Sequence, residues 1–162
     1  MKGSFGTVPF SRVKDVDEWN VTWNDETNAN VSIGNNILFK INSVSWLPGN
    51  NLGLFSNVEF EPTKILGFYH GIQVPESDLE NLSKDEISNK CKYLLEISKP
   101  KIINMDAFPI LEKCPFAYMN DPRGHTEEQN AYFTTSGYVR ALKKINIGDE
   151  ILIDYGQNYE FC

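Results

Sequence analysis

The sequence predicts one mainly-β domain with a few short helices, an α+β arrangement. Short runs of alternating apolar and polar residues recur along the chain, and turn-forming residues separate them. Helical patterns are confined to one stretch, so the regular alternation of strands and helices found in parallel α/β folds is missing. With 162 residues, of which 41% are hydrophobic and 23% charged, a single domain covering 1–162 can bury a core.

The first third of the chain gives one clear strand. Up to about Asn36 the pattern is irregular, and we expect Trp19 and Trp23 to act as packing anchors there. The stretch NILFKINSV, Asn36–Val44, alternates apolar and polar residues as a half-buried strand does. The next stretch, LPGNNLGLFS (47–56), is rich in turn-forming residues and is predicted as a connection.

The middle third combines strands with the helical stretch. TKILGFYHGIQV, 63–74, is predicted to form one or two strands. SDLE at Ser77 and SKDE at Ser83 match the capping box, in which a serine and a glutamate satisfy free amides at the start of a helix. One or two short helices are therefore expected within 77–92, and YLLEI returns to a strand from Tyr93.

The last third predicts a hairpin and a closing strand. NAYFTT and YVRAL flank a turn at Ser136 and Gly137, which is typical of a β-hairpin. After a second turn, EILIDY (150–155) is predicted to be the closing strand.

Composition excludes several classes of protein. The net charge of −7 makes the fold a poor binder of nucleic acid, which needs clustered Lys and Arg, but would attract a basic partner. The apolar runs are too short to cross a membrane, and the first residues lack the apolar core of a signal peptide. We therefore expect an intracellular protein of the nucleus or cytoplasm. The three cysteines, Cys91, Cys114 and Cys162, are too widely spaced to indicate a disulfide framework or a metal site.

Four stretches, in order, resemble the SET domain, a family of protein-lysine methyltransferases that use S-adenosylmethionine. NNLGLFSNVEFEPTKILGFYHG (50–71) resembles the family's G-x-G opening and closing Y-x-G, and YLLEI with INMDA resembles its next strand and its I-D-A. FAYMNDP (116–122), with Asn130 and Ala131 beyond it, resembles A-R-F-x-N-H-S and the later N-A. VRALKKINIGDEILIDYGQNY (139–159) matches nearly all of the family's C-terminal motif.

This resemblance implies a β-clip-like SET fold whose C-terminal segment threads beneath the N-H-S loop as a pseudoknot, an exception to the usual absence of threaded connections. It divides the chain into an N-terminal flank (1–45), an N-terminal SET half (46–76), the helical insert (77–92) and a C-terminal half with the pseudoknot (93–162). No cysteine-rich post-SET zinc segment is present, so we expect a compact, free-standing domain. Such domains sometimes pair, and a homodimer is a further expectation.

Lysine methylation needs a neutral amine aligned with the methyl donor. The reference pKa of lysine, ~10.4, leaves only about one amine in 2500 neutral at pH 7. An apolar tunnel disfavours the ammonium and so helps the lysine to deprotonate. Alignment of nitrogen, methyl carbon and sulfur can then be supplied by positioning, with tyrosine hydroxyl and backbone carbonyl groups around the amine.

The resemblance assigns candidate roles to individual residues. Tyr155 matches the catalytic tyrosine that orients the amine, and Tyr69 matches a channel tyrosine that contacts the incoming nitrogen. Ile153 matches a channel position where a tyrosine favours monomethylation; isoleucine leaves room, so dimethyl and trimethyl products are expected. The residues expected to contact S-adenosylmethionine are Asn51, Leu52, Gly53, Asn120, Asp121 and Tyr159.

Each of these residues also has a plainer interpretation. Buried tyrosines commonly pack with a single hydrogen bond, and Gly53 could serve a turn. Asn51 replaces the first glycine of G-x-G, and Asp121 replaces the histidine of N-H-S. The interval between Asn120 and Asn130 is longer than in the family pattern, so the residues between them are expected to bulge outward.

Three functions remain compatible with the sequence. The first is an S-adenosylmethionine-dependent methyltransferase acting on lysine in a basic protein, with a histone tail as the expected substrate. The second is a SET module with weak or no activity that binds a peptide or partner, as the altered motifs at Asn51 and Asp121 would suggest. The third is a methyltransferase acting on a protein other than a histone.

Overall fold

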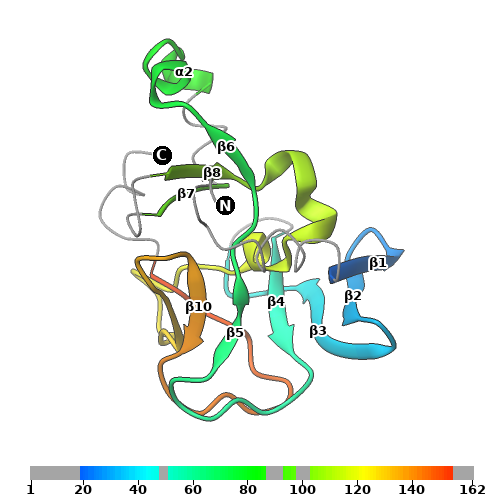
Figure 1. Ribbon diagram of the computed structural model, residues 1–162. Helices are drawn as coiled ribbons and strands as arrows, with labels where there is room; N and C mark the ends of the chain where they lie inside the picture. The colour runs from blue at the N-terminus through cyan, green and yellow to red at the C-terminus, as the bar shows by residue number, and fades with distance from the viewer. Residues whose placement is uncertain (1–18, 48–50, 87–92, 98–102, 155–162) are drawn as a thin grey trace.

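The computed structural model describes residues 19–47, 51–86, 93–97 and 103–154 (Figure 1). Within these ranges the chain forms three small antiparallel sheets, accompanied by short helices only. The prediction of a mainly-β domain with short helices is therefore confirmed. Tyr155 and Tyr159, two of the expected site residues, lie outside the described residues.

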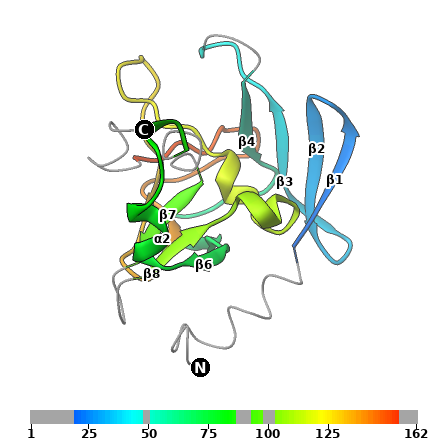
Figure 2. The ribbon, with the colours of Figure 1, turned by 90° about the horizontal axis from the view of Figure 1, so that it is seen from above.

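The first sheet is a four-stranded meander in which each strand pairs with the next one along the chain (Figures 1 and 2). Its strands are β1 (Trp19–Asp25), β2 (Asn28–Ile33), β3 (Asn36–Ser43) and β4 (Leu52–Ser56). Two residues separate β1 from β2 and β2 from β3, so the pairing of these three strands is local.

The expectation of irregular structure before Asn36 was wrong for residues 19–35, and residues 1–18 lie outside the described ranges. The sequence of β1 alternates, but its outward positions carry Asn and Thr, which weaken the strand signal. The turn to β2 is closed by Asp25, whose Oδ1 accepts hydrogen bonds from Thr27 N at 2.7 Å and Thr27 Oγ1 at 2.8 Å. Trp19 is a buried anchor as predicted, whereas Trp23 is 42% exposed and so does not anchor the core.

The prediction that 47–56 is a connection was also wrong for its second half. Leu52–Ser56 forms β4, which pairs antiparallel with β3 so that Gly53 faces Asn42. Glycine is a residue typical of turns, but the backbone of Gly53 continues the sheet. Gly53 is therefore a strand residue rather than a turn residue.

Two three-stranded sheets complete the fold, with strand orders β5-β10-β9 and β6-β8-β7. The predictions of strands in 63–74, of a strand from Tyr93 and of the hairpin around Gly137 are all confirmed. Figure 2 shows the 3-10 helices between the first sheet and the β6-β8-β7 sheet. These elements are β5 (Ile65–Phe68), β6 (Ile72–Val74), β7 (Leu94–Ile97), β8 (Ile103–Asp106), η1 (Phe108–Lys113), η2 (Pro115–Tyr118), β9 (Ala131–Phe133) and β10 (Tyr138–Ala141).

The two predicted capping boxes have different outcomes. At Ser83 the box is present: Ser83 N donates to Glu86 Oε1 and Glu86 N donates to Ser83 Oγ, both at 3.2 Å. At Ser77 it was wrong, because helix α2 (Glu76–Glu80) begins one residue earlier and places this serine inside the helix. The helix starts after a proline, which the capping pattern does not take into account.

The final described segment, Glu150–Ile153, was predicted as a closing strand and instead makes three separate bridges. Glu150 pairs antiparallel with Phe55 beside β4, while Leu152 and Ile153 pair in parallel with Asn120 and Ala131. The segment therefore runs between β4 and the two ends of the 121–130 loop. Alternation in the sequence indicated an extended segment correctly, but it carries no information about the number of partners.

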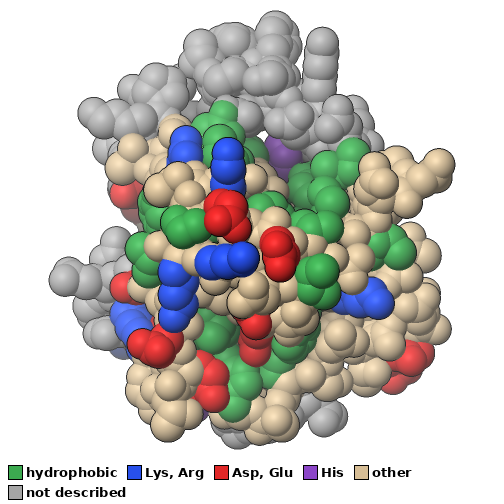
Figure 3. Space-filling model, turned by 90° about the horizontal axis from the view of Figure 1, so that it is seen from below, with side chains coloured by type: hydrophobic (Ala, Val, Ile, Leu, Met, Phe, Trp, Pro, Cys, Tyr) green, Lys and Arg blue, Asp and Glu red, His purple; other side chains and the backbone are tan. Residues whose placement is uncertain are grey.

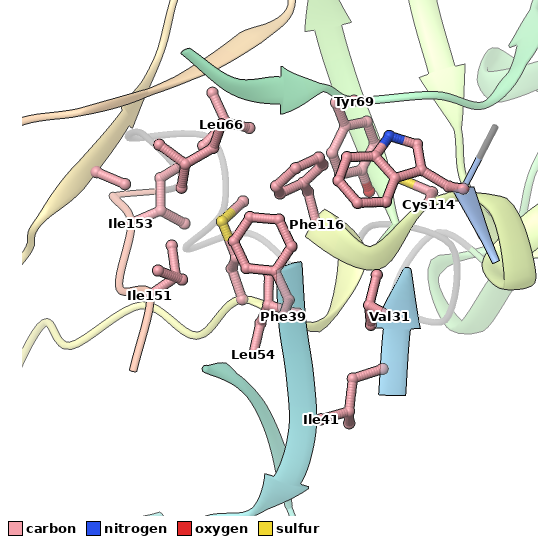
Figure 4. Packing of buried hydrophobic residues seen from close by; sticks show 14 of the residues in the cluster. Val31, Phe39, Ile41, Leu54, Leu66, Tyr69, Cys114, Phe116, Ile151 and Ile153 are labelled. Carbon is pink, nitrogen blue, oxygen red and sulfur yellow. The ribbon is translucent and has the colours of Figure 1, made fainter. Parts of the chain in front are cut away.

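The main core lies where the first sheet, η2 and this final segment meet (Figure 4). Phe39, which is fully buried, is at its centre. The Phe39 ring contacts Trp19 at 5.8 Å, Phe60 at 5.7 Å and Phe116 at 5.5 Å between ring centroids. Edge-to-face and stacked pairs at these distances add to the burial of their apolar area.

Because Phe39 has three aromatic neighbours that cannot all collapse into its space, Phe39→Ala is expected to lower the free energy of unfolding by about 3–5 kcal/mol. The matched control is Phe108→Ala, where the side chain is 60% exposed and the loss should stay below about 1 kcal/mol. Urea unfolding followed by circular dichroism measures both. Equal losses in the two variants would contradict this description of the core.

Candidate functional site

Asn130 fastens the final segment into the fold. Its Nδ2 donates to the Glu150 carbonyl oxygen at 2.7 Å, and its Oδ1 accepts from Leu152 N at 2.8 Å. Its own backbone N donates to the Leu152 carbonyl oxygen at 3.0 Å. The side chain is nearly buried, with 7% of the residue exposed, so these bonds satisfy backbone groups that water does not reach.

Asn120 joins the same segment to β4 from the other side of the loop. Its carbonyl oxygen accepts from Ile153 N at 3.0 Å. Its Nδ2 donates to the Leu52 carbonyl oxygen and to Glu150 Oε2, both at 2.9 Å. Both amide protons are thus used on acceptors, and among the described residues no hydrogen bond reaches Asn120 Oδ1. That oxygen can accept a hydrogen bond from a ligand.

Glu150 lies between these groups and carries a partly buried carboxylate. Oε1 accepts from Trp46 Nε1 at 2.7 Å, and Oε2 accepts from Asn120 Nδ2. Burial raises the pKa of the Glu150 carboxyl above its ordinary value of 4.5, the two hydrogen bonds lower it, and the nearby charge of Glu127 raises it. The net effect is a raised pKa, so the fold pushes this group towards its protonated form.

Gly53 is needed because the Glu150 carboxylate lies against its backbone. A Cβ at this position would come within 2.5 Å of Glu150 Oε2 and 2.7 Å of Val44 Cγ1. The absence of a side chain therefore lets the carboxylate reach between β4 and Asn120. The neighbouring Asn51 is exposed, and its carbonyl oxygen accepts from Val44 N at 3.0 Å.

The 121–130 loop begins with Asp121, the second residue of the N-H-S-like motif that is predicted to contact the cofactor. As expected, it bulges outward, with residues 123–126 exposed. Asp121 Oδ2 forms an ion pair with Arg123 Nε at 2.8 Å, which offsets the negative charge that replaces the family's histidine. His125, also on this loop, packs its ring edge-to-face on Trp46 with centroids 5.0 Å apart. Asp121, Arg123, His125 and Asp154 line a surface hollow of about 250 Å³.

Tyr69 and Ile153, the predicted channel residues within the described ranges, are both buried. The Tyr69 hydroxyl donates to the Tyr93 carbonyl oxygen at 2.8 Å, as a packing tyrosine commonly does. Ile153 is fully buried in the main core. Their roles at a lysine channel remain predictions.

Sequence reasoning missed Glu150 and Trp46. Glu150 follows Gly148 and Asp149, so the stretch looks like a solvated acidic turn, and nothing in the pattern indicates a partly buried carboxylate. Trp46 stands just before a turn-rich stretch and was placed at the boundary of the domain halves without a role. A glycine inside a strand, such as Gly53, can indicate that another group approaches the backbone closely. This signal could have pointed to these residues.

Three further features of the described residues concern metal binding, membrane spans and surface charge. In these ranges there is no group of three or more His, Cys, Asp or Glu side chains that could hold a metal ion. None of the helices there has the length and apolar character that a membrane span requires. Figure 3 shows a face on which Lys and Arg side chains lie beside Asp and Glu side chains. Among the ion pairs of the described residues, Lys144 Nζ lies 3.9 Å from Glu59 Oε1 and 3.7 Å from Glu61 Oε2.

Comparisons with known proteins give matches among solved structures. No protein-family model matches the sequence, and no curated protein matches it. The structure is similar to the methyltransferase domain of human PR domain-containing protein 2, with a TM-score of 0.49 and 20% sequence identity, covering 72% of this chain and 77% of that chain. At this identity the similarity does not assign a cofactor, a substrate or a catalytic residue to this chain.

The raised pKa of Glu150 predicts how stability depends on pH. Below its ordinary pKa of 4.5 the carboxyl is protonated in both states. As the pH rises, the unfolded chain releases the proton first, so the contribution of Glu150 to the free energy of unfolding falls until the pH passes its folded pKa.

The measurement is urea unfolding of wild type and Glu150→Gln across this range. The free energy of unfolding of wild type minus that of the variant should decrease from pH 4.5 upward and then level off. A difference that increases with pH would contradict the burial described for this carboxylate.

Proposed function

We propose that this protein is an S-adenosylmethionine-dependent methyltransferase that transfers a methyl group to the side-chain amine of lysine in a basic protein. A histone tail is the proposed substrate. The proposal combines the four ordered sequence motifs with the way in which the chain assembles three of them around Asn120.

The observation that carries the proposal is the meeting of Leu52, Asn120 and Glu150. They come from three stretches that are far apart in the sequence, and each belongs to a different SET-like motif. Direct hydrogen bonds from Asn120 Nδ2 connect them. If Asn120 served only to pack the fold, the three motifs would not need to meet at its side chain.

The groups present fit the amino-acid end of the cofactor. Asn120 Oδ1 is an available acceptor for an ammonium group, and the partly buried Glu150 carboxylate makes the local field favourable to a cation. Asn51, an exposed residue, directly precedes β4 beside these groups. When bound, the cofactor supplies an activated methyl group on a sulfonium. The remaining steps depend on the residues of the chain.

We propose that Tyr155 and Tyr69 contact the amine of the lysine substrate. Tyr155, one residue beyond the described part, would orient the amine. Tyr69, whose hydroxyl donates to the Tyr93 carbonyl oxygen, would contact the incoming amine. The buried aliphatic Ile153 contributes to apolar surroundings, which favour a neutral lysine and leave room for more than one methyl group.

A basic substrate is consistent with the charge of the chain. A net charge of −7 attracts lysine-rich segments over roughly a Debye length of about 10 Å at 0.1 M salt. This attraction supports the class of substrate and does not select a particular protein.

A second candidate is a SET module that binds a peptide without turnover. Asp121 favours it, because its carboxylate is engaged by Arg123 at the position where the family has histidine. The two candidates differ in the need for S-adenosylmethionine, which only the enzyme must bind.

Calorimetry with S-adenosylmethionine tests the enzyme directly. We expect saturable 1:1 binding in the micromolar range that is typical of enzymes for their substrates. Radiolabelled methyl transfer to histones should follow, and Tyr155→Phe should reduce it by about 10²-fold or more if the hydroxyl orients the amine. The cofactor affinity of Tyr155→Phe should be unchanged.

Two results would contradict the proposal. Absence of binding at millimolar cofactor would favour the peptide-binding module. Equal transfer by wild type and Tyr155→Phe would remove this tyrosine from its proposed role.

A further inference from the structure

The Glu150 side chain links Trp46 and Asn120 directly, in addition to the backbone hydrogen bonds that Ile151 N and Ile153 N donate to the Leu54 and Asn120 carbonyl oxygens. Its two carboxylate oxygens each accept one hydrogen bond, from the indole of Trp46 and from the amide of Asn120. The same carboxylate lies against Gly53, where no larger residue fits. We call Trp46, Glu150 and Asn120 the carboxylate clamp.

The clamp determines which way the Asn120 amide faces. The Nδ2 group has two acceptors, the Leu52 carbonyl oxygen and Glu150 Oε2, each at 2.9 Å. With the amide turned over, Oδ1 would face two oxygen acceptors and both bonds would be lost. An ionised Glu150 therefore keeps the amide nitrogen inward and leaves Oδ1 as the acceptor for a ligand.

We propose that Glu150 is a positioning residue whose ionised carboxylate holds the Trp46 indole and the Asn120 amide in one arrangement, so that Asn120 Oδ1 can receive the ammonium group of the bound cofactor. This inference rests on the proposed function for the identity of the ligand. The clamp itself is independent of that identity.

Protonation of Glu150 would weaken this arrangement. A proton on Oε2 makes that oxygen a donor and a poorer acceptor for Asn120 Nδ2, and a proton on Oε1 weakens the bond from Trp46 in the same way. The Asn120 amide could meet the new donor only by turning, which brings Oδ1 against the Leu52 carbonyl. Cofactor affinity should therefore fall as the pH falls through the pKa of the clamp.

The other ionisable groups around the clamp come from the 121–130 loop. The negative charge of Glu127 raises the pKa of Glu150, and the ring of His125 packs on Trp46. Asp121 is engaged with Arg123. Glu127 makes no hydrogen bond to the clamp among the described residues, so its removal changes the field at Glu150 and leaves the clamp intact. This makes Glu127→Gln a matched control.

The first experiment uses the cofactor-free chain. Tryptophan fluorescence is titrated from about pH 4.5 to 7, a range that begins near the ordinary pKa of glutamate. Wild type should show one transition that Glu150→Gln and Trp46→Phe both abolish, because Trp46 is the tryptophan bonded to the carboxylate. Glu127→Gln should retain the transition at lower pH. A transition that persists unchanged in Glu150→Gln would overturn the clamp.

The second experiment measures the dissociation constant of S-adenosylmethionine by calorimetry over the same pH range. Wild-type affinity should fall up to tenfold per pH unit below the transition, and Glu150→Gln should bind at least tenfold more weakly at pH 7, with that dependence gone. Glu127→Gln should equal wild type at pH 7. Equal affinities of wild type and Glu150→Gln at pH 7 would overturn the positioning role.

Two further outcomes remain decisive. If Glu150→Gln does not fold, Glu127→Gln carries the test, because an unshifted pH dependence of affinity in that variant overturns the inference. If wild type binds no cofactor at any pH while its fluorescence titration still depends on Glu150, the proposed function and the ammonium contact are both overturned, and the clamp is retained.

Discussion

The insertion of residues 150–153 between β4 and the 121–130 loop is the constraint on which the rest of the structure depends. These residues have no continuous ladder of their own, so side-chain amides supply what a neighbouring strand would normally give. Asn130 makes two such bonds, one as donor and one as acceptor. Asn120 supplies its backbone carbonyl to the segment and its side chain to β4. A change at either asparagine therefore affects packing and site together, because the segment that completes the core also carries Glu150.

The site departs from what stability alone would favour. A carboxylate raised in pKa by burial makes the fold less stable once it is ionised, and an apolar residue would avoid this cost. This loss of stability occurs at a position where the carboxylate accepts hydrogen bonds from the Asn120 amide and the Trp46 indole. Gly53 belongs to the same arrangement, because it gives up side-chain packing in a strand to leave space for the carboxylate. Such local losses are common where a residue serves a ligand rather than the core.

The sequence predicts this fold best where one face of a strand is consistently apolar. Asn36–Ser43 and the hairpin at Gly137 satisfy this condition and were predicted correctly. Trp19–Asp25 was missed because its other positions carry polar residues that resemble a loop. In the site, the motifs predicted Asn120 and Gly53 as cofactor contacts; the structure gives their neighbours within the chain, and the cofactor contacts stay predictions. Glu150 could not be predicted, since its burial depends on segments about 30 and 100 residues away, whose approach no local pattern encodes.

The proposed function requires β4, the Asn120 region and the final segment to form one cofactor cradle. Hydrogen–deuterium exchange with and without S-adenosylmethionine tests this claim most directly, because it reports on each segment separately. The account predicts that the cofactor slows exchange jointly in 51–56, 118–122 and 149–153 and leaves the β1–β2 hairpin at 19–33 unchanged. Slowed exchange confined to other segments, or no change in any of these three, would contradict it.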